Sequence, residues 1–239
     1  MIKINSVTKN FKSGIKKSLI KAVNELSFNI HKNKTLGIIG PNGAGKTSLL
    51  KMILGFIKPD KGFIEINEKS PMDYKSRGKT GYLPENPYYY DNLTLNELFL
   101  FSFQITKTNK YDFKKRADYL LKKTGLLSVR KAKLSSYSKG MLQKAGICLA
   151  LINNPDLIIF DEPTSGLDPI ARKILSDIIL DLKNKNKTII ICSHILNDIE
   201  KLCDQIIIMA DGKIKAKYLK KDLVKNKTDL EQVFIETVM

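Results

Sequence analysis

A glycine-rich segment near the start of the chain constrains its fold more than any other feature. The segment reads GPNGAGKT from Gly40 to Thr47, follows an apolar run at 35–39 and leads into a helical pattern at 46–56. A strand, a loop of this spacing and a helix are the context in which a P-loop binds nucleotide phosphates. The glycines let backbone N–H groups face a phosphate, and the helix N-terminus adds partial positive charge. A chance glycine turn is disfavoured, so we expect an α/β core built around a nucleotide.

The residues of this segment have separate expected roles. Lys46 reaches the β- and γ-phosphates, and the hydroxyl of Thr47 can ligate Mg²⁺. The residues expected to line the nucleotide are Gly40, Pro41, Asn42, Gly43, Ala44, Gly45, Lys46, Thr47 and Ser48. The predicted cofactors are therefore ATP and Mg²⁺.

A pair of carboxylates follows a second apolar run. Leu157–Phe160 leads directly into Asp161 and Glu162. An aspartate at the carboxyl end of a parallel strand lies beside a P-loop, where it can hold Mg²⁺. The adjacent Glu162 can orient or deprotonate the attacking water. Such a pair alone could simply begin a solvated loop, but its position downstream of a P-loop favours a hydrolytic site.

Length and composition agree with a globular chain. Its 239 residues suit one large domain or a core with a subdomain, and 43% of them are apolar. No apolar run reaches the roughly 18 residues that span a bilayer. The start, MIKINSVTKNFK, has no apolar segment or cleavage site, so we do not expect a signal peptide. Cys148, Cys192 and Cys203 form no CxxC pair, which favours a reducing cytosol.

The net charge of +17, from 41 Lys and Arg against 24 Asp and Glu, allows two interpretations. One is a basic face for nucleic acid or anionic lipid. The other is a solvated, lysine-rich surface, which we favour because the lysines are spread along the whole chain. We expect no specific nucleic acid partner. Weak attraction to an anionic membrane stays open.

Hydrophobic periodicity and turn residues predict the secondary structure. The expected strands are 27–30, 35–39, 62–67, 80–83, 157–161, 188–192 and a hairpin of 205–209 with 213–217. The expected helices are 46–56, one opening at a Thr94–Glu97 capping box, 112–124 ending at Gly125, 139–153, one opening at Asp168-Pro169, and 229–239. In the helix after Asp168, the residues Ile170, Ile174, Ile178 and Leu182 are expected to form the apolar stripe.

A third motif lies between the P-loop and the carboxylates and reads YSKGMLQK from Tyr137 to Lys144. With the three motifs in this order, nearly all of the chain resembles the nucleotide-binding subunits of ABC transporters. In that family each ATP lies between two head-to-tail subunits, one giving its P-loop and the other its signature segment. The signature is usually LSGGQ or LSGGM, so the resemblance puts Ser138 and Gly140 on phosphate-contacting positions. Lys139 replaces a glycine there, and Ser138 could also be a simple helix cap.

The resemblance implies further site residues. SGLD at 165–168 resembles the D-loop, which crosses the dimer interface and adds Asp168 to the nucleotide site. His194 stands at the position of the switch histidine that contacts the γ-phosphate, whereas His31 is expected to be a surface residue. Phe11 stands where the family stacks an aromatic ring on adenine, although a buried strand phenylalanine is nearly as plausible.

One position departs from the family pattern. GYLPENPYYY at 81–90 resembles the Q-loop, yet Glu85 stands where glutamine is usual. A carboxylate there can still bind Mg²⁺ or water, so Glu85 is an expected catalytic and metal-binding residue. Tyr88–Tyr90 lies where such proteins meet their membrane partner, but a packed helical core is an alternative.

We therefore expect an α/β fold with a P-loop NTPase core, a mostly parallel sheet, an antiparallel β-subdomain and an inserted helical subdomain. The expected single domain at 1–239 comprises a catalytic core with the β-subdomain at 1–85 and 155–218, a helical subdomain at 86–154 and a short tail at 219–239. The implied partners are a separate transmembrane permease subunit and a second ATPase subunit, in a homodimer or a heterodimer. The implied location is the cytoplasm, on the inner face of the cell membrane.

The expected function is ATP hydrolysis that powers export through that permease. Exporter-type ATPases are suggested by the GYLPE segment, the short tail and the LEQVFIE ending, which is an analogy only. A soluble ABC ATPase acting on ribosomes or nucleic acid is the alternative, supported by the charge but disfavoured by the single domain and the short helical insert. A catalytically dead binding module is disfavoured because Lys46, Asp161, Glu162 and His194 are all present.

Overall fold

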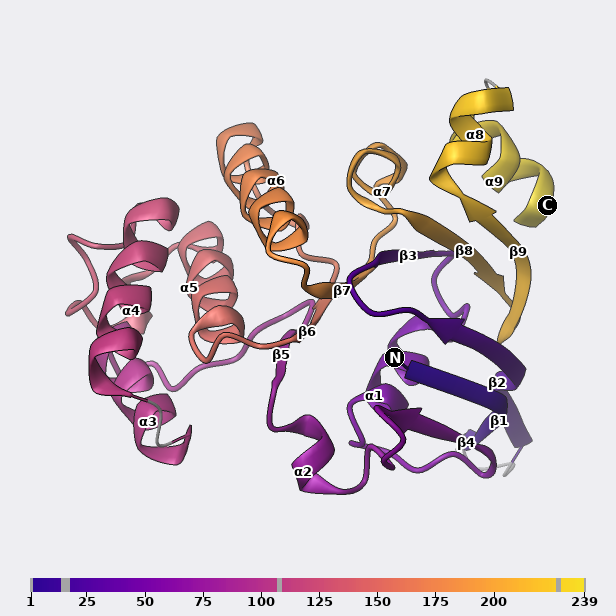
Figure 1. The fold of residues 1–239 in the computed structure, drawn as a ribbon, viewed down its shortest axis with the longest axis horizontal. Coiled ribbons are helices and arrows are strands. Elements are labelled where there is room, and N and C mark those ends of the chain that lie inside the picture. The colour runs from indigo at the N-terminus through magenta and orange to yellow at the C-terminus, as the bar shows by residue number, and fades with distance from the viewer. Residues whose placement is uncertain (1, 14–17, 107–108, 227–228, 239) are drawn as a thin grey trace. The chain divides into compact units, whose positions relative to one another are not determined.

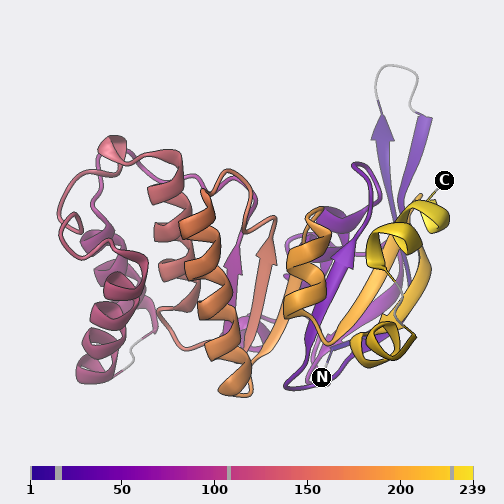
Figure 2. The same ribbon diagram turned by 90° about the horizontal axis from the view of Figure 1, so that it is seen from above.

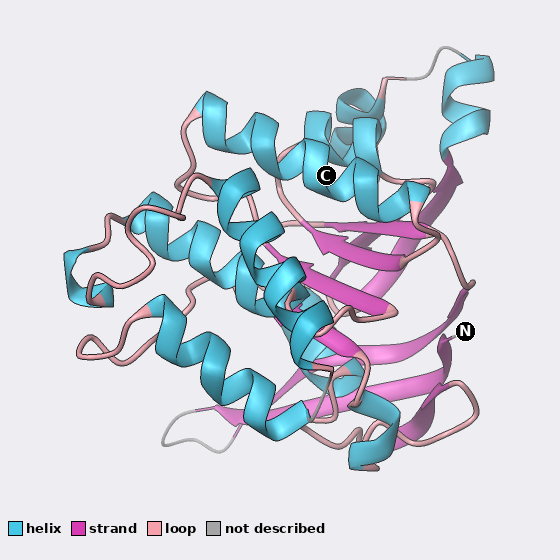
Figure 3. Ribbon diagram, turned by 60° about the vertical axis from the view of Figure 1, so that its left-hand side comes forward, coloured by secondary structure: helices cyan, strands magenta, loops and turns pink. Residues whose placement is uncertain are grey.

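The computed structural model describes residues 2–13, 18–106, 109–226 and 229–238. The chain forms two compact units, each with its own strands and helices. Figure 3 colours the helices cyan and the strands magenta. The first unit comprises Met1–Gly78 and Thr188–Met239, and the second unit comprises Lys79–Lys187. The second unit is therefore inserted in the sequence between the two halves of the first.

An antiparallel sheet opens the first unit (Figure 1). Its strand order is β2-β1-β4, from β1 (Ile2–Ser13), β2 (Ser18–Ile30) and β4 (Lys61–Ile66). The sequence predicted only the last four residues of β2 and missed β1. Register shifts follow Ile4 and Val7, and Ser6 and Glu25 adopt positive φ angles of 48° and 55°. These irregularities interrupt the alternation of apolar and polar residues by which strands are recognised.

The P-loop strand lies in a second, mostly parallel group of strands in the first unit. β3 (Thr35–Ile39) pairs in parallel with β7 (Thr188–Cys192) on one side and with β8 (Gln205–Ala210) on the other, and β9 (Lys213–Leu219) runs antiparallel to β8. Every residue of β3 and β7 is buried, as expected for strands covered on both faces. The helices of this unit are α1 (Lys46–Ile53), α2 (Tyr74–Arg77), α7 (Leu196–Leu202), α8 (Lys220–Asn226) and α9 (Leu230–Val238).

The second unit joins a parallel strand pair to a group of helices. β5 (Thr80–Leu83) pairs with β6 (Leu157–Asp161). The helices are α3 (Leu95–Thr106), α4 (Lys110–Thr124), α5 (Lys139–Leu151) and α6 (Pro169–Asn184). Among them α3, α4 and α5 contact one another, and α4 also contacts α6. Figure 2 views these helices from above, with α6 in orange and the earlier ones in magenta.

Several predicted helix ends are confirmed. The hydroxyl of Thr94 accepts a hydrogen bond from the Glu97 amide at 3.1 Å, and the Glu97 carboxylate accepts one from the Thr94 amide at 2.8 Å. This backbone donor holds the pKa of Glu97 below its usual value. Gly125 ends α4 with a φ of 72°, and the predicted Asp211-Gly212 turn joins β8 to β9. Met239, the last residue of the expected terminal helix, lies outside the described residues.

The predicted apolar stripe of α6 is confirmed at Ile178 and wrong at Ile170. Ile170 is 75% exposed, and the buried side chains are Ala171, Leu175, Ile178 and Ile179. Residues four apart drift by about 40° per step around a helix with 3.6 residues per turn, so a stripe spaced strictly by four leaves the buried face. The prediction also missed α2, α7 and α8. In the part of the chain that the structure describes, no helix is both long and apolar enough to cross a membrane.

Candidate nucleotide site

The P-loop follows β3 and is shaped by close backbone approaches. A Cβ atom on Gly40 would collide with the backbone carbonyl of Met209, and one on Gly45 would collide with that of Ala22. Gly45 also has a φ of 95°, a conformation that side chains strongly disfavour. Gly40 and Gly45 are therefore required by packing inside the first unit, whereas at Gly43 the φ of 82° is the only constraint, because a Cβ there would meet nothing within 4 Å.

The turn between β8 and β9 braces the P-loop. The Gly212 amide donates to the Ala44 carbonyl at 3.2 Å, and the Asn24 amide donates to the Gly212 carbonyl at 2.8 Å. Asp211 and Gly212 have φ angles of 51° and 70°, the two positive values of a tight hairpin turn. Sequence reasoning predicted this turn but missed its contact with the P-loop, because nothing local signals a partner so distant in the chain.

Lys46, the first residue of α1, turns its side chain back into the loop. Its ammonium donates to the carbonyls of Gly40 at 2.6 Å and Pro41 at 3.0 Å, and the residue is buried. Thr47 is exposed, and α1 has no acidic residue in its first turn. A cation, a free hydroxyl and a helix N-terminus without competing carboxylates suit the phosphates of a nucleotide.

Strand register places His194 at the same sheet edge as the P-loop. Ile38 of β3 lies opposite Cys192 of β7 in a parallel pair, and two residues further along each strand come Gly40 and His194. The Ser193 amide donates to the Ile38 carbonyl at 3.3 Å, and the Ser193 hydroxyl accepts from the Ile195 amide at 3.0 Å. His194 is exposed after this turn, so its imidazole is accessible at the carboxyl edge of the sheet.

Phe11 lies on the antiparallel sheet of the first unit. It is 41% exposed, so it is not the buried strand residue of the alternative interpretation. Its strand partner is Ile20, two residues before Ala22, whose carbonyl lies against the P-loop. The ammonium of Lys9 lies 5.7 Å from the centre of the Phe11 ring. An exposed ring on this sheet could stack on a planar base.

The paired carboxylates stand at the end of β6 in the second unit. Asp161 and Glu162 are 3% and 8% exposed. Glu162 has a φ of 48°, which is rare for a residue with a side chain and costs on the order of 1–3 kcal/mol. The Glu162 carbonyl accepts from the Ser165 amide at 3.1 Å, and the next carbonyl, of Pro163, accepts from the Gln143 side chain at 3.2 Å. This strained backbone is held in place by its neighbours, as is common where a side chain is aimed for chemistry.

Glu85 shares the carboxyl edge of this strand pair. Leu83 of β5 lies opposite Phe160 of β6, and two residues further along come Glu85 and Glu162. Glu85 is exposed. Glu85, Asp161 and Glu162 therefore follow the two strands at one edge of the second unit, but among the described residues no three such side chains lie close enough together to hold a metal ion by themselves.

The signature segment begins α5 and is open to contact. The Ser138 hydroxyl caps the helix by accepting from the Met141 amide at 3.3 Å, and a Cβ atom on Gly140 would meet nothing within 4 Å. Tyr137, in place of the usual leucine, is buried and its hydroxyl donates to the Val129 carbonyl at 2.9 Å. Burial raises the pKa of Tyr137, so it remains a neutral donor.

The unusual Lys139 is placed against the SGLD loop. A Cβ atom on Gly166 would lie 3.0 Å from Cε of Lys139, so the lysine side chain covers this glycine. Asp168 is exposed and caps α6, its carboxylate accepting from the Ala171 amide at 2.7 Å. The sequence singled out Lys139 as a departure from the family, but not this contact.

The site residues therefore fall into two sets. The first unit carries residues 40–48, His194 and Phe11, and the second carries the carboxylates, the signature residues and Asp168. Within the first unit the residues fit a nucleotide: the loop opens a helix N-terminus, Lys46 supplies a cation, and Thr47 supplies an exposed oxygen donor. Within the second unit Asp161 supplies a carboxylate of the kind that Mg²⁺ prefers.

Comparison with known sequences gives a family. The sequence profile of the ABC transporter family matches residues 23–165. An uncharacterised ABC transporter ATP-binding protein of Synechocystis is 41% identical over 82% of this chain, and the bacitracin transport ATP-binding protein of Bacillus licheniformis is 39% identical over 90% of it. The matches cover 56% and 68% of those proteins, and the chain spans about half the length of the cyanobacterial relatives.

Comparison with solved structures gives the same family as the sequence comparison. The ATP-binding subunit of an ABC transporter superposes with a TM-score of 0.90 and 28% identity, covering 99% of both chains. A dimeric ATP-binding cassette in a post-hydrolysis state, bound to ADP and Pi, gives a TM-score of 0.83 and 26% identity, covering 92% of this chain and 99% of that one.

Proposed function

Because this chain belongs to the ABC transporter family and carries its ATPase cassette, we propose that it powers export of a substrate through a separate membrane-spanning permease. The observation that carries the hydrolytic part is Glu162, nearly buried and held at a positive φ directly after Asp161. A role in transport is supported by the likeness to the bacitracin transport ATP-binding protein, and the export direction by analogy of the GYLPE and LEQVFIE segments.

The proposed roles follow from the chemistry of each side chain. The P-loop amides and Lys46 bind the phosphates, while Thr47, Asp161 and Glu85 hold Mg²⁺. When bound, Mg²⁺ neutralises charge that develops on the phosphate oxygens. Glu162 accepts a proton from the attacking water, and His194 contacts the γ-phosphate. Phe11 stacks on adenine.

A second ATPase subunit is proposed to complete each site. The exposed Ser138 and the open space at Gly140 are accessible to a nucleotide held by a partner, and Asp168 lies on the loop proposed to cross between subunits. The dimeric cassette bound to ADP and Pi supports this arrangement. The partner is a second copy of this chain or a different ATPase subunit.

The proposed permease contact lies on the second unit. Tyr88 is 86% exposed, and Tyr90 is also exposed just before α3. On α3 itself Leu100, Phe101 and Ile105 are exposed. Exposed aromatic and aliphatic side chains of this density are typical of protein interfaces. The chain would then act on the cytoplasmic face of the cell membrane.

The catalytic part is tested with Glu162→Gln, which keeps the shape of the side chain but cannot accept the proton. Phosphate release should fall by on the order of 10²–10⁴ while ATP binding persists. Glu65→Gln, on β4 and away from the site residues, is the control and should hydrolyse ATP at the normal rate. Near-normal turnover by Glu162→Gln would remove Glu162 from this role.

The transport part is tested by fractionation of a lysate from the cells that make this protein. The chain should float with membranes in a density gradient and lose this association when the permease gene is deleted. The net charge of +17 would favour binding to RNA or DNA, so it supports one alternative function, a soluble ABC ATPase that acts on ribosomes or nucleic acid. Sedimentation with ribosomes, insensitive to the permease deletion, would favour that alternative.

A further inference from the structure

The second unit contains a cavity of about 650 Å³ that the proposed ATPase does not use. Its walls come from α4, the end of α5 and α6. The segment after α5 and the segment after α6 also line it. Pro155, at its margin, precedes β6, whereas Asp161 ends that strand. At about 3.3 Å per residue, the strand separates the cavity from the carboxylates by roughly 15 Å or more.

The inner wall of the cavity is apolar. Leu120, Leu151 and Ile178 line it and are themselves almost fully buried. Their side chains are fixed by the packing of α4, α5 and α6. Only 3–4% of each of these side chains is exposed, so an apolar chain in the cavity would touch their edges together with the aliphatic parts of the longer lining side chains.

Three of the six charged residues that line the cavity are already paired. The Asp181 carboxylate accepts from Lys185 at 2.8 Å and from the Tyr119 hydroxyl at 2.7 Å, and these bonds hold the pKa of Asp181 below its usual value. Lys187 pairs with Asp156 at 3.1 Å. These groups satisfy one another and need no ligand.

Arg116 is the least exposed of the remaining charged residues, which also include Asp112 and Lys115. It lines the cavity and is only partly exposed, and within the described residues it has no hydrogen bond or ion pair. Burial lowers its pKa, and Asp112, one helical turn earlier, acts on it only through its charge. Leaving a guanidinium half-buried without a partner is costly, and its planar fork matches a phosphate or carboxylate. Lys115, next in the chain, adds a second cation at the rim.

We propose that this cavity binds a small amphipathic anion, whose phosphate or carboxylate pairs with Arg116 and whose apolar chain lies on Leu120, Leu151 and Ile178. The ligand would contact α4 and α6 together. Its binding would therefore stabilise the second unit and is independent of the proposed ATP site.

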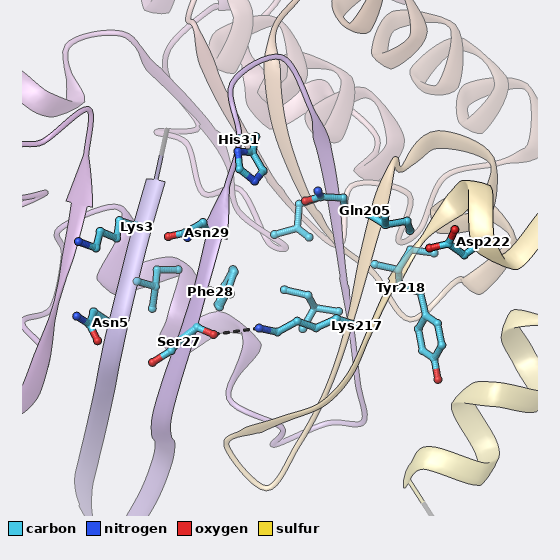
Figure 4. A pocket seen from close by; sticks show the side chains of 15 residues that line it. Lys3, Asn5, Ser27, Phe28, Asn29, His31, Gln205, Lys217, Tyr218 and Asp222 are labelled. Carbon is cyan, nitrogen blue, oxygen red and sulfur yellow. Dashed lines mark hydrogen bonds between the residues drawn. The ribbon is translucent and has the colours of Figure 1, made fainter.

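The first unit offers a useful contrast. A cavity of about 680 Å³ lies between β1, β2, β8, β9 and α8, and His31 is at its rim, exposed as the sequence predicted (Figure 4). Lys217, the cation at its centre, already donates to the Ser27 carbonyl at 3.0 Å and lies 5.9 Å from the centre of the Phe28 ring. Among the described residues that line this cavity, no half-buried cation lacks a partner, and we propose no ligand for it.

The test is calorimetric titration of the full chain with hexyl phosphate, in a Lys46→Ala background that prevents binding of the probe at the P-loop. Hexyl phosphate should bind saturably and raise the melting temperature, whereas hexanol, which lacks the anion, should bind far more weakly. Arg116→Gln should weaken binding by at least about tenfold. Arg130→Gln is the matched control, because Arg130 pairs with Asp118 at 3.3 Å and does not line the cavity.

A conservative variant guards against misfolding. Arg116→Lys keeps the charge but loses the fork, so its affinity for hexyl phosphate should lie between those of the parent and Arg116→Gln. Equal affinity in all three, or no saturable binding to the parent, would overturn the proposal.

Vesicles distinguish two sources of the anion. Binding to phosphatidylcholine vesicles that contain phosphatidic acid, lost in Arg116→Gln, would assign the site to a membrane lipid. Vesicle binding that does not depend on Arg116, together with Arg116-dependent binding of hexyl phosphate, would assign it to a soluble metabolite.

Discussion

Lys139 illustrates how a single residue acquires a structural role that its sequence position does not reveal. Its side chain lies across Gly166, so Lys139 adds to the Gln143–Pro163 hydrogen bond a second contact between α5 and the loop before α6. The sequence could identify Lys139 as unusual for the family and Ser138 as a cap. The neighbour of Lys139 depends on how two helices pack, which no local pattern encodes.

At the residue scale we predict that the methylene groups of Lys139 contribute more to stability than its charge. Lys139→Met keeps an apolar stem and removes a cation from a helix N-terminus, so the free energy of unfolding should change by less than about 0.5 kcal/mol. Lys139→Gly removes the contact and adds backbone freedom, and should cost about 1 kcal/mol. Urea unfolding compares the two variants, and equal losses would show that the ammonium is the group that matters.

At the element scale, the sequence predicted best those strands and helix ends whose structure depends on residues close together in the chain. Buried strands such as β3 and β7 are continuous apolar runs, and the caps at Thr94 and Gly125 are local hydrogen-bond patterns. The long strand β1 was missed because its bulges interrupt the alternation. The P-loop itself was recognised at once, but not the turn that braces it.

The hydrogen bond from the Gly212 amide to the Ala44 carbonyl of the P-loop gives a prediction that a second glycine, Gly125, can control. Gly212 and Gly125 have nearly equal φ angles of 70° and 72°, so replacing either with alanine adds the same backbone strain, about 1 kcal/mol. The new methyl group at position 125 would meet nothing within 4 Å, whereas at position 212 it would lie 2.9 Å from the Ala22 carbonyl. Gly212→Ala should therefore cost more stability than Gly125→Ala in thermal melts.

The same pair of variants tests the link to the P-loop. Because the Gly212 amide bonds to the Ala44 carbonyl, Gly212→Ala should also weaken ATP binding, whereas Gly125→Ala should not. Isothermal titration with ATP measures both. An unchanged ATP affinity in Gly212→Ala would mean that the brace serves stability alone.

At the scale of the whole molecule, we predict that two copies of the chain close around two ATP molecules. Glu162→Gln with ATP and Mg²⁺ should form a dimer, because binding persists while hydrolysis is blocked. Adding Ser138→Arg should prevent the dimer by placing bulk and charge against the partner's γ-phosphate, whereas the exposed Ser128→Arg should not. Light scattering gives the mass, and a monomer at saturating ATP and high protein concentration would contradict the homodimer.

The discontinuity of the first unit has a consequence for how the protein is made. β3 is flanked by β7 and β8, and both are synthesised only after the whole second unit has been synthesised. During that interval the apolar surface of β3 has no permanent cover, and such pairings between distant segments form slowly. Ribosome-bound chains arrested before residue 188 should therefore be cleaved by protease within residues 35–56, whereas the released protein resists. Protection of that segment in the arrested chain would show that the nucleotide-binding half folds without its late strands. If it is cleaved, the segment that contains β3 and the P-loop stays unfolded until β7 and β8 are made, and it then depends on chaperones to prevent its aggregation.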